Sequence, residues 1–266
     1  LYVPTFASVP LPANGTTTDG AAVELSWRAG REASSHRVYL GTDAADLSLV
    51  ATTTEAAYLA HGLTYGTSYY WSVTEVNETE AVPSYAGDTW SFRVPDAGVV
   101  DNFELYDNRC KRIFFTWQDG FGHNGGQDIE DCDIPPFRGN GSSSTVGHAS
   151  APFAEQTIVF SGRQSLPLTY EDDSEATVNV ADLRIGRDWT QGAPTTLVLW
   201  IRGDSGNSSA DQLYAKINDS KVTCNGDLSM PIWRQWNIDL GTLGIDLSSV
   251  HKLSIGVEAS DTGILY

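Results

Sequence analysis

The chain has 266 residues, too many for one small domain and well suited to two domains of ordinary size. Its 34 acidic and 16 basic residues give a formal net charge of −18, which excludes the basic surface that nucleic acids and anionic membranes require. Hydrophobic residues make up 41% of the chain, enough for packed cores, yet no run approaches the roughly 18 apolar residues of a membrane helix. The chain begins without Met and without a signal peptide, so we expect an interior or processed piece.

The pattern of the chain is that of successive strands. Short runs rich in Val, Ile, Thr, Tyr and Trp alternate with clusters of Gly, Asn, Asp and Ser, and helix signals are nearly absent. This pattern predicts an all-β chain. We divide it into an N-terminal strand or linker at residues 1–8, a first domain at 9–95 and a second domain at 99–266, with a Gly- and Asp-rich insertion at 120–144.

In the first domain, residues 63–73 are the most informative. Gly66 supplies a turn, and Tyr69, Trp71 and Val73 then alternate onto one face, which predicts a strand with one face in a core. Strands separated by turns suggest a seven-stranded sandwich. The predicted strands cover residues 22–28, 37–40, 50–58, 68–75 and 89–94.

An ordered set of segments carries a closer resemblance. These segments are residues 22–27, 35–42, 67–77 and 89–92. They resemble the immunoglobulin-type, fibronectin type III-like repeats that are common in large surface proteins of planctomycete-type bacteria. The resemblance implies an extracellular spacer or adhesion module.

The second domain carries a different resemblance, over residues 99–106, 115–120, 144–147, 151–159, 162–168, 188–190, 197–204, 212–218 and 233–240. These segments are similar to galactose-binding-like jelly rolls, which include carbohydrate-binding modules. In related bacterial proteins such domains sit beside fibronectin-like, lectin-like and glycan-processing modules. The expected architecture is therefore a fibronectin type III-like sandwich followed by a jelly roll.

A calcium site is the first candidate for chemistry. Asp101 and Glu104 stand three apart, and Asp119 lies between Trp117 and a Gly. Calcium takes six to eight oxygen ligands, and the jelly-roll resemblance implies a structural calcium near Asp101 and Glu104. The alternative is that these acids are turn residues facing water. The insertion holds further acids, including Asp128 and Asp131, which predict either a second cation or an acidic loop.

Aromatic side chains are the second candidate, because sugars pack their C–H faces on exposed rings. Trp189 and Trp117 lie in polar surroundings and are the predicted platforms, whereas Trp200 lies in an apolar run and is predicted to be core. Trp233 and Trp236 are three apart and so point to opposite faces of a strand. The predicted hydrogen-bonding residues are Arg163, Gln164, Tyr170 and Arg202.

The cysteines and glycosylation sequons fit an exported protein. Cys110 and Cys132 flank part of the insertion and could form a disulfide, which leaves Cys224 free or intermolecular. No Cys-x-x-Cys pair supports zinc or redox chemistry. Asn-x-Ser/Thr sequons stand at Asn14, Asn77, Asn140, Asn207 and Asn218.

Catalytic patterns are weak. The five His residues share no motif, and the chain has no Gly-x-Ser-x-Gly elbow and no Walker-type loop. A pair of carboxylates for glycoside hydrolysis is left as an alternative, because acids are plentiful and the sequence does not give their separation. We therefore expect a non-enzymatic extracellular or cell-surface module that binds a polysaccharide or cell-surface glycan. One alternative is a structural repeat of a surface layer, stalk or fibre, joined head to tail to copies of itself by strand addition through residues 1–6. Another is an accessory module of a polysaccharide-degrading enzyme.

Overall fold

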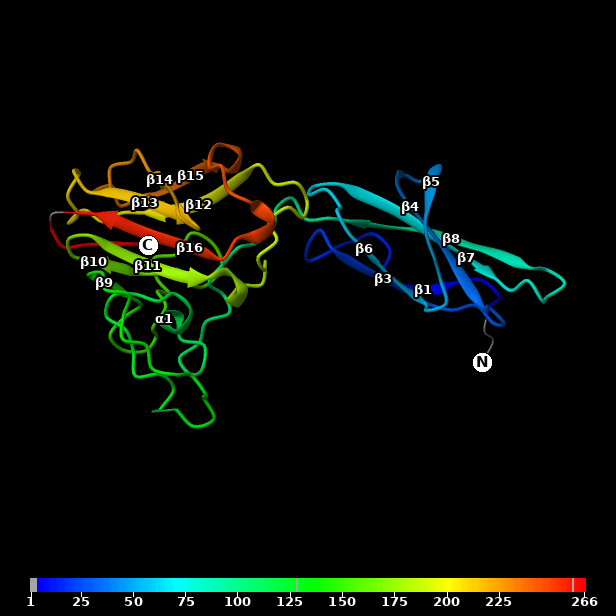
Figure 1. Cartoon of the computed structure of the whole chain (residues 1–266), viewed down its shortest axis with the longest axis horizontal. Helices are drawn as coiled ribbons and strands as arrows, with labels where there is room; N and C mark the ends of the chain where they lie inside the picture. Colours follow the sequence, from blue (N-terminus) through cyan, green and yellow to red (C-terminus); the bar gives the residue numbers. More distant parts are fainter. Residues whose placement is uncertain (1–3, 128, 260) are drawn as a thin grey trace. The chain divides into compact units, whose positions relative to one another are not determined.

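The computed structural model describes residues 4–127, 129–259 and 261–266. The chain forms two compact units, which we call the N-terminal unit (Leu1–Gly98 with Thr190–Pro194) and the C-terminal unit (Val99–Trp189 with Thr195–Tyr266). Both are β-sandwiches, as predicted (Figure 1). The short α1 (Ile113–Thr116) belongs to the C-terminal unit. Among the described residues, no helix has both the length and the hydrophobicity that a membrane span needs.

The N-terminal unit has two sheets. Strands β1, β3 and β6 form one, in that order, and the other has the order β2-β8-β7-β4-β5. This strand order is that of a fibronectin type III-like sandwich. The strands are β1 (Ser8–Leu11), β2 (Thr16–Thr17), β3 (Val23–Arg28), β4 (Ser35–Asp43), β5 (Asp46–Thr53), β6 (Ala57–Ala60), β7 (Ser68–Val76) and β8 (Ser84–Arg93).

The core of this unit confirms the alternation predicted for residues 63–73. Trp71 and Val73 on β7 are fully buried, and Trp71 packs against Trp90 of β8 with ring centroids 4.7 Å apart. The hydroxyl of Tyr69 accepts a hydrogen bond from the Thr64 N–H at 3.0 Å, which fixes the corner that leads into the strand. These residues are therefore core and corner residues and offer no site.

Two expectations for this unit are wrong in part. The predicted strand at residues 50–58 is two strands, because the hydroxyl of Thr53 accepts a hydrogen bond from the Glu55 N–H at 3.0 Å and turns the chain between β5 and β6. Residues 1–8 are predicted to form a strand or a linker, and the strand is not formed at residues 4–7, since β1 begins at Ser8. Pro4 has no N–H to donate to a neighbouring strand. Residues 1–3 lie outside the described residues.

The C-terminal unit is built from a four-stranded sheet of order β11-β16-β13-β14, a sheet of order β17-β10-β9, and the pair β12-β15. Arg202 at the end of β12 exchanges two backbone hydrogen bonds with Tyr266, of 2.8 and 2.9 Å, so the pair continues the β17 sheet. The jelly-roll resemblance of this sandwich stays a prediction. The strands are β9 (Ser144–Val146), β10 (Leu168–Tyr170), β11 (Ser174–Asn179), β12 (Thr196–Arg202), β13 (Gln212–Ile217), β14 (Ser220–Thr223), β15 (Trp233–Asp239), β16 (Lys252–Glu258) and β17 (Gly263–Leu265).

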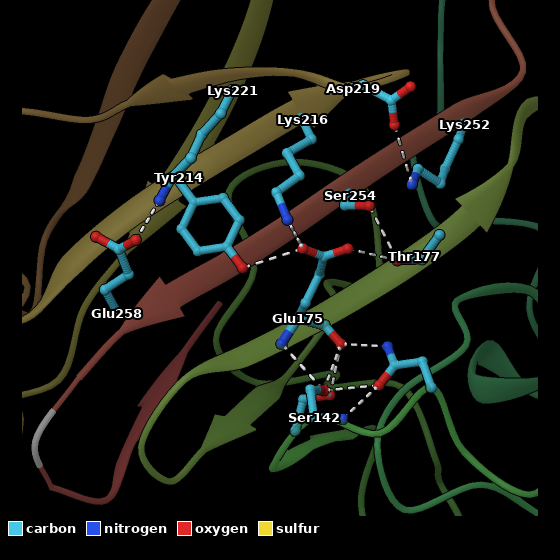
Figure 2. Close-up of polar contacts among 12 residues, drawn as sticks. Ser142, Glu175, Thr177, Tyr214, Lys216, Asp219, Lys221, Lys252, Ser254 and Glu258 are labelled. Atoms are coloured by element: carbon cyan, nitrogen blue, oxygen red, sulfur yellow. Dashed lines mark hydrogen bonds and ion pairs between the residues drawn. The ribbon is translucent and has the colours of Figure 1, made fainter.

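The outer face of the four-stranded sheet carries a polar network around Glu175 (Figure 2). Its carboxylate accepts hydrogen bonds from Lys216 Nζ at 2.5 Å and from the Tyr214 hydroxyl at 3.0 Å. The Tyr214 ring reaches Glu175 by crossing the intervening strand over Gly256, where an added Cβ would lie 2.3 Å from its Cζ. Tyr214 is therefore 7% exposed although it is on the outer face. Because its groups satisfy one another, we assign this network to stability.

The close approach at Gly256 makes a stability prediction. Gly256→Ala should lower the free energy of unfolding by about 1–3 kcal/mol, because the methyl group meets both the Tyr214 ring and the backbone carbonyl of Ser174. Urea unfolding followed by Trp fluorescence measures this loss. Gly206→Ala is the control, since its Cβ would meet nothing closer than 3.4 Å. Equal stability of the two variants would contradict the assignment.

Candidate functional site

The outward face of the β12-β15 pair carries a group of exposed aromatic rings. The strands pair antiparallel, with Trp200 opposite Gln235 and Arg202 opposite Trp233. Leu197 and Ile201 point inward and are each 7% exposed. The alternating residues of β12 therefore point outward.

Three rings on this face form what we call the aromatic platform: Phe160, Trp200 and Trp233. Phe160 and Trp200 stack with their centroids 3.7 Å apart and their planes 14° apart, and the Trp233 centroid lies 5.9 Å from that of Phe160. Phe160 is 45% exposed and Trp200 is 40% exposed. Burial would normally be expected for rings of this size, so their exposure marks a surface available for contact.

Polar side chains lie beside the platform on the same two strands. Gln235 donates a hydrogen bond to Asn237 Oδ1 at 2.7 Å, and both side chains are exposed. The Arg202 guanidinium lies 5.7 Å from the ring centroid of Tyr266 and is half-buried. The face therefore combines open ring surfaces with hydrogen-bonding groups, which suits a ligand that has both apolar C–H surface and hydroxyl groups.

The loop that carries Phe160 is closed at its base by Glu155. Backbone hydrogen bonds of 3.1 and 2.9 Å join Glu155 to Ser165 in both directions. The Glu155 carboxylate then accepts hydrogen bonds from the N–H groups of Thr157 and Ile158, at 2.5 and 3.0 Å, and lies 3.0 Å from His148 Nε2. We call residues 155–165 the platform loop. The buried Glu155 carboxylate fixes the start of this loop, and the Ser165 hydroxyl donates across it to the Ile158 carbonyl at 2.6 Å.

The same contacts determine the ionisation of this group. Burial by itself raises the pKa of Glu155, but the hydrogen bonds from Thr157, Ile158 and His148 outweigh it and lower the pKa to about 2. The carboxylate is therefore ionised throughout the neutral range, as its role as an acceptor requires.

The prediction that Trp189 and Trp117 are exposed aromatic platforms is wrong. Trp189 and Trp117 are each 3% exposed. The indole N–H of Trp189 donates to the Gly186 carbonyl at 3.0 Å, and that of Trp117 donates to Asp101 Oδ2 at 2.9 Å. Each ring turned inward because its N–H has a partner there, which polar neighbours in the sequence could not show.

Other predicted site residues are divided between the interior and the surface. Tyr170 is fully buried and donates to Asp211 Oδ2 at 2.9 Å, so the expectation that it contacts a ligand is wrong. Trp200, predicted to be core, is exposed instead. Arg202 lies beside the aromatic platform, and Arg163 lies on the platform loop with 80% of its side chain exposed. Trp233 and Trp236 lie on opposite faces, as predicted, because Trp236 packs on the core.

The predicted calcium ligands do not form a shared site. Asp101 accepts from the Tyr106 hydroxyl, the Trp117 indole and the Phe103 N–H. Glu104 accepts from the backbone of the platform loop, and Asp119 accepts from the N–H groups of Gly122 and Val146, at 2.7 Å each. The fold therefore uses all three carboxylates as hydrogen-bond acceptors, and a structural calcium ion at them stays a prediction. Within residues 4–127, 129–259 and 261–266, no group of three metal-binding side chains is found; Asp128 lies outside them.

The predicted disulfide between Cys110 and Cys132 is present, and Cys224 is a free, buried thiol.

The Asn residues of the glycosylation sequons differ in how exposed their side chains are. Asn207 is 7% exposed and its amide donates to two carbonyls, so the expectation of glycosylation there is wrong for the folded chain. The amides of Asn77, Asn140 and Asn218 also donate to carbonyl oxygens, whereas the exposed Asn14 uses its side-chain oxygen as an acceptor for Ser91.

No protein-family model and no curated protein matches the chain. Solved structures match in part. An Fn3-like protein from Clostridium thermocellum is 23% identical over 37% of this chain and 100% of its own, with a TM-score of 0.29. A β-1,2-glucanase from Parabacteroides distasonis is 15% identical over 60% of this chain and 24% of its own, with a TM-score of 0.33. A chitinase from Bacillus thuringiensis is 10% identical over 97% of this chain and 28% of its own, with a TM-score of 0.25.

The chain thus spans about a quarter of the length of either enzyme. At these TM-scores the likenesses carry no argument about function. The fibronectin type III-like description of the N-terminal unit rests on its strand order.

The depressed pKa of Glu155 predicts an acid-sensitive platform loop. Its contribution to folding is fully present above its ordinary pKa of 4.5 and is lost as the pH falls through about 2. The loss is on the order of 3 kcal/mol. Glu155→Gln should remove this part of the dependence of the unfolding free energy on pH, which denaturant titrations between pH 2 and pH 7 measure.

The matched control for this experiment is Glu171→Gln, which changes an exposed carboxylate of the same unit. Its curve should keep the shape of the wild-type curve. If the Glu155→Gln curve also ran parallel to wild type, Glu155 would not be the closing contact of the loop.

Proposed function

We propose that the chain is a non-catalytic glycan-binding module of the cell exterior, and that the aromatic platform holds the sugar. The observation that carries this proposal is the exposed Phe160–Trp200 stack beside Trp233. Pyranose rings present C–H faces that pack on such rings, while Arg202 and Gln235 supply hydrogen bonds to hydroxyl groups.

The charge of the chain favours a neutral polysaccharide. A net charge of −18 repels a polyanion at long range, and one arginine beside the platform offsets little of that field. Polar and aromatic groups alternate across this face, which supports a sugar ligand over a purely apolar partner. We therefore assign an uncharged, hydroxyl-rich chain as the ligand.

The chemistry of the neighbouring carboxylates supports a binding role without catalysis. Glycoside hydrolysis uses two carboxyl groups that flank the scissile bond and exchange protons with it. Glu155 lies on the platform loop and Glu104 and Asp107 lie beside it, and each accepts two or more hydrogen bonds from the protein. Their contacts are those of structural residues.

The disulfide supports a place outside the cytoplasm. Disulfides form and persist in oxidising compartments and are rare where thiols are kept reduced. Cys110–Cys132 joins residues 22 positions apart in the C-terminal unit. We therefore propose an extracellular or cell-surface location.

The direct test is Trp200→Ala in affinity gels that contain soluble β-glucans, xylans, mannans or galactans. The wild-type protein should be retarded by at least one of them, and Trp200→Ala should weaken that binding at least tenfold, about 1.4 kcal/mol. Because the ring is on the surface, its loss should leave the unfolding temperature nearly unchanged.

Phe121→Ala is the matched control, because Phe121 is a 79% exposed ring of the insertion. It should bind like wild type. The proposal fails if the wild-type protein binds none of these polysaccharides, or if Trp200→Ala binds as tightly as Phe121→Ala.

A further inference from the structure

A second surface feature lies along the platform loop. It is a depression of about 600 Å³. Its lining includes the polar side chains of Tyr106, Asp107, Asn108, Gln156, Arg163 and Gln164. None of these residues belongs to the aromatic platform.

The polar groups of this depression are only partly used within the protein. Arg163 donates through Nε to Glu104 at 3.1 Å, and no Nη contact of Arg163 is found among the described residues. Asn108 accepts through Oδ1 from the Phe153 N–H at 3.1 Å, which leaves its amide N–H groups for other partners. Gln156 is exposed, and its side-chain amide offers both N–H donors and a carbonyl acceptor. The depression thus offers planar donors and acceptors of the kind that sugar hydroxyls require.

These groups are held on a fixed frame. The Tyr106 hydroxyl donates to Asp101 Oδ2 at 2.5 Å, and Gln164 donates to the carbonyl groups of Phe103 and Tyr106 at 3.2 and 3.1 Å. The Glu104 carboxylate accepts from the N–H groups of Arg163 and Gln164. The backbone that carries Arg163 and Gln164 is therefore fixed, so a ligand would order little of the main chain on binding.

The depression adjoins the platform through the chain itself. Val159 lines the depression, and the next residue, Phe160, stacks on Trp200. The two features therefore share the platform loop, since the Cα atoms of these consecutive residues are about 3.8 Å apart. A linear ligand that follows this loop from the platform would reach the depression.

We propose that this depression is a second sugar subsite, so that the ligand is an oligomeric stretch of a polysaccharide and not a single terminal sugar. This inference rests on the proposed function of the aromatic platform. It adds Arg163, Gln156 and Asn108 as residues that contact the outer sugar units.

The test uses oligosaccharides of one to six units, cut from the polysaccharide that retards the wild-type protein, with affinities measured by calorimetry on the whole chain. Affinity of the wild-type protein should rise with length. Arg163→Ala and Gln156→Ala should each remove most of that rise, with up to a tenfold loss for the longest oligosaccharide and little change for the shortest. Trp200→Ala should weaken binding at every length.

Arg184→Ala is the charge control, since Arg184 is exposed and lies outside both features. It should follow wild type at every length. Affinity that does not depend on length, or Arg163→Ala and Gln156→Ala proteins that bind the longest oligosaccharide like wild type, would overturn the second subsite and leave the platform intact. Absence of any binding by the wild-type protein would instead overturn the proposed function, and this inference with it.

Discussion

The buried Glu155 carboxylate holds the loop that carries Phe160 of the aromatic platform. Glu155 closes the base of the platform loop by accepting hydrogen bonds from Thr157 and Ile158 while its backbone pairs with Ser165. That closure positions Phe160 against Trp200. The same loop forms part of the wall of the neighbouring depression. Both surface features therefore depend on contacts made by this loop, those of Glu155 at its base and those of Glu104 beside Arg163 and Gln164.

The strand β12 shows how far sequence patterning predicts a site. Alternation in residues 63–73 identified a core face correctly, because polar and apolar residues take turns there. In β12 both faces are apolar, so the pattern could not tell that Leu197 and Ile201 face the core while Trp200 faces water. Which face of β12 is buried depends on the layer that packs on the strand, and this is set by the tertiary structure. Phe160 gave no local signal at all, since its partner lies 40 residues away along the chain.

The opposite error occurred at Trp189 and Trp117. Polar neighbours suggested exposure, but each indole N–H found an acceptor in the interior, so both rings are buried. The acids predicted to bind calcium also have partners within the fold, because backbone and side-chain groups donate hydrogen bonds to Asp101, Glu104 and Asp119. Fold class and the Cys110–Cys132 pair could be predicted from residue pattern and spacing, whereas partner choice by polar groups required the folded chain.

Contact of a glycan with Trp200 and Trp233 can be followed through the indole N–H resonances of the eight Trp residues. In an NMR titration of the labelled protein with oligosaccharides cut from the polysaccharide that it binds, we expect the Trp200 and Trp233 signals to shift. The signals of the buried Trp71, Trp117 and Trp189 should stay in place. Shifts confined to the buried indoles, or no indole shift at saturating ligand, would contradict glycan binding at the aromatic platform.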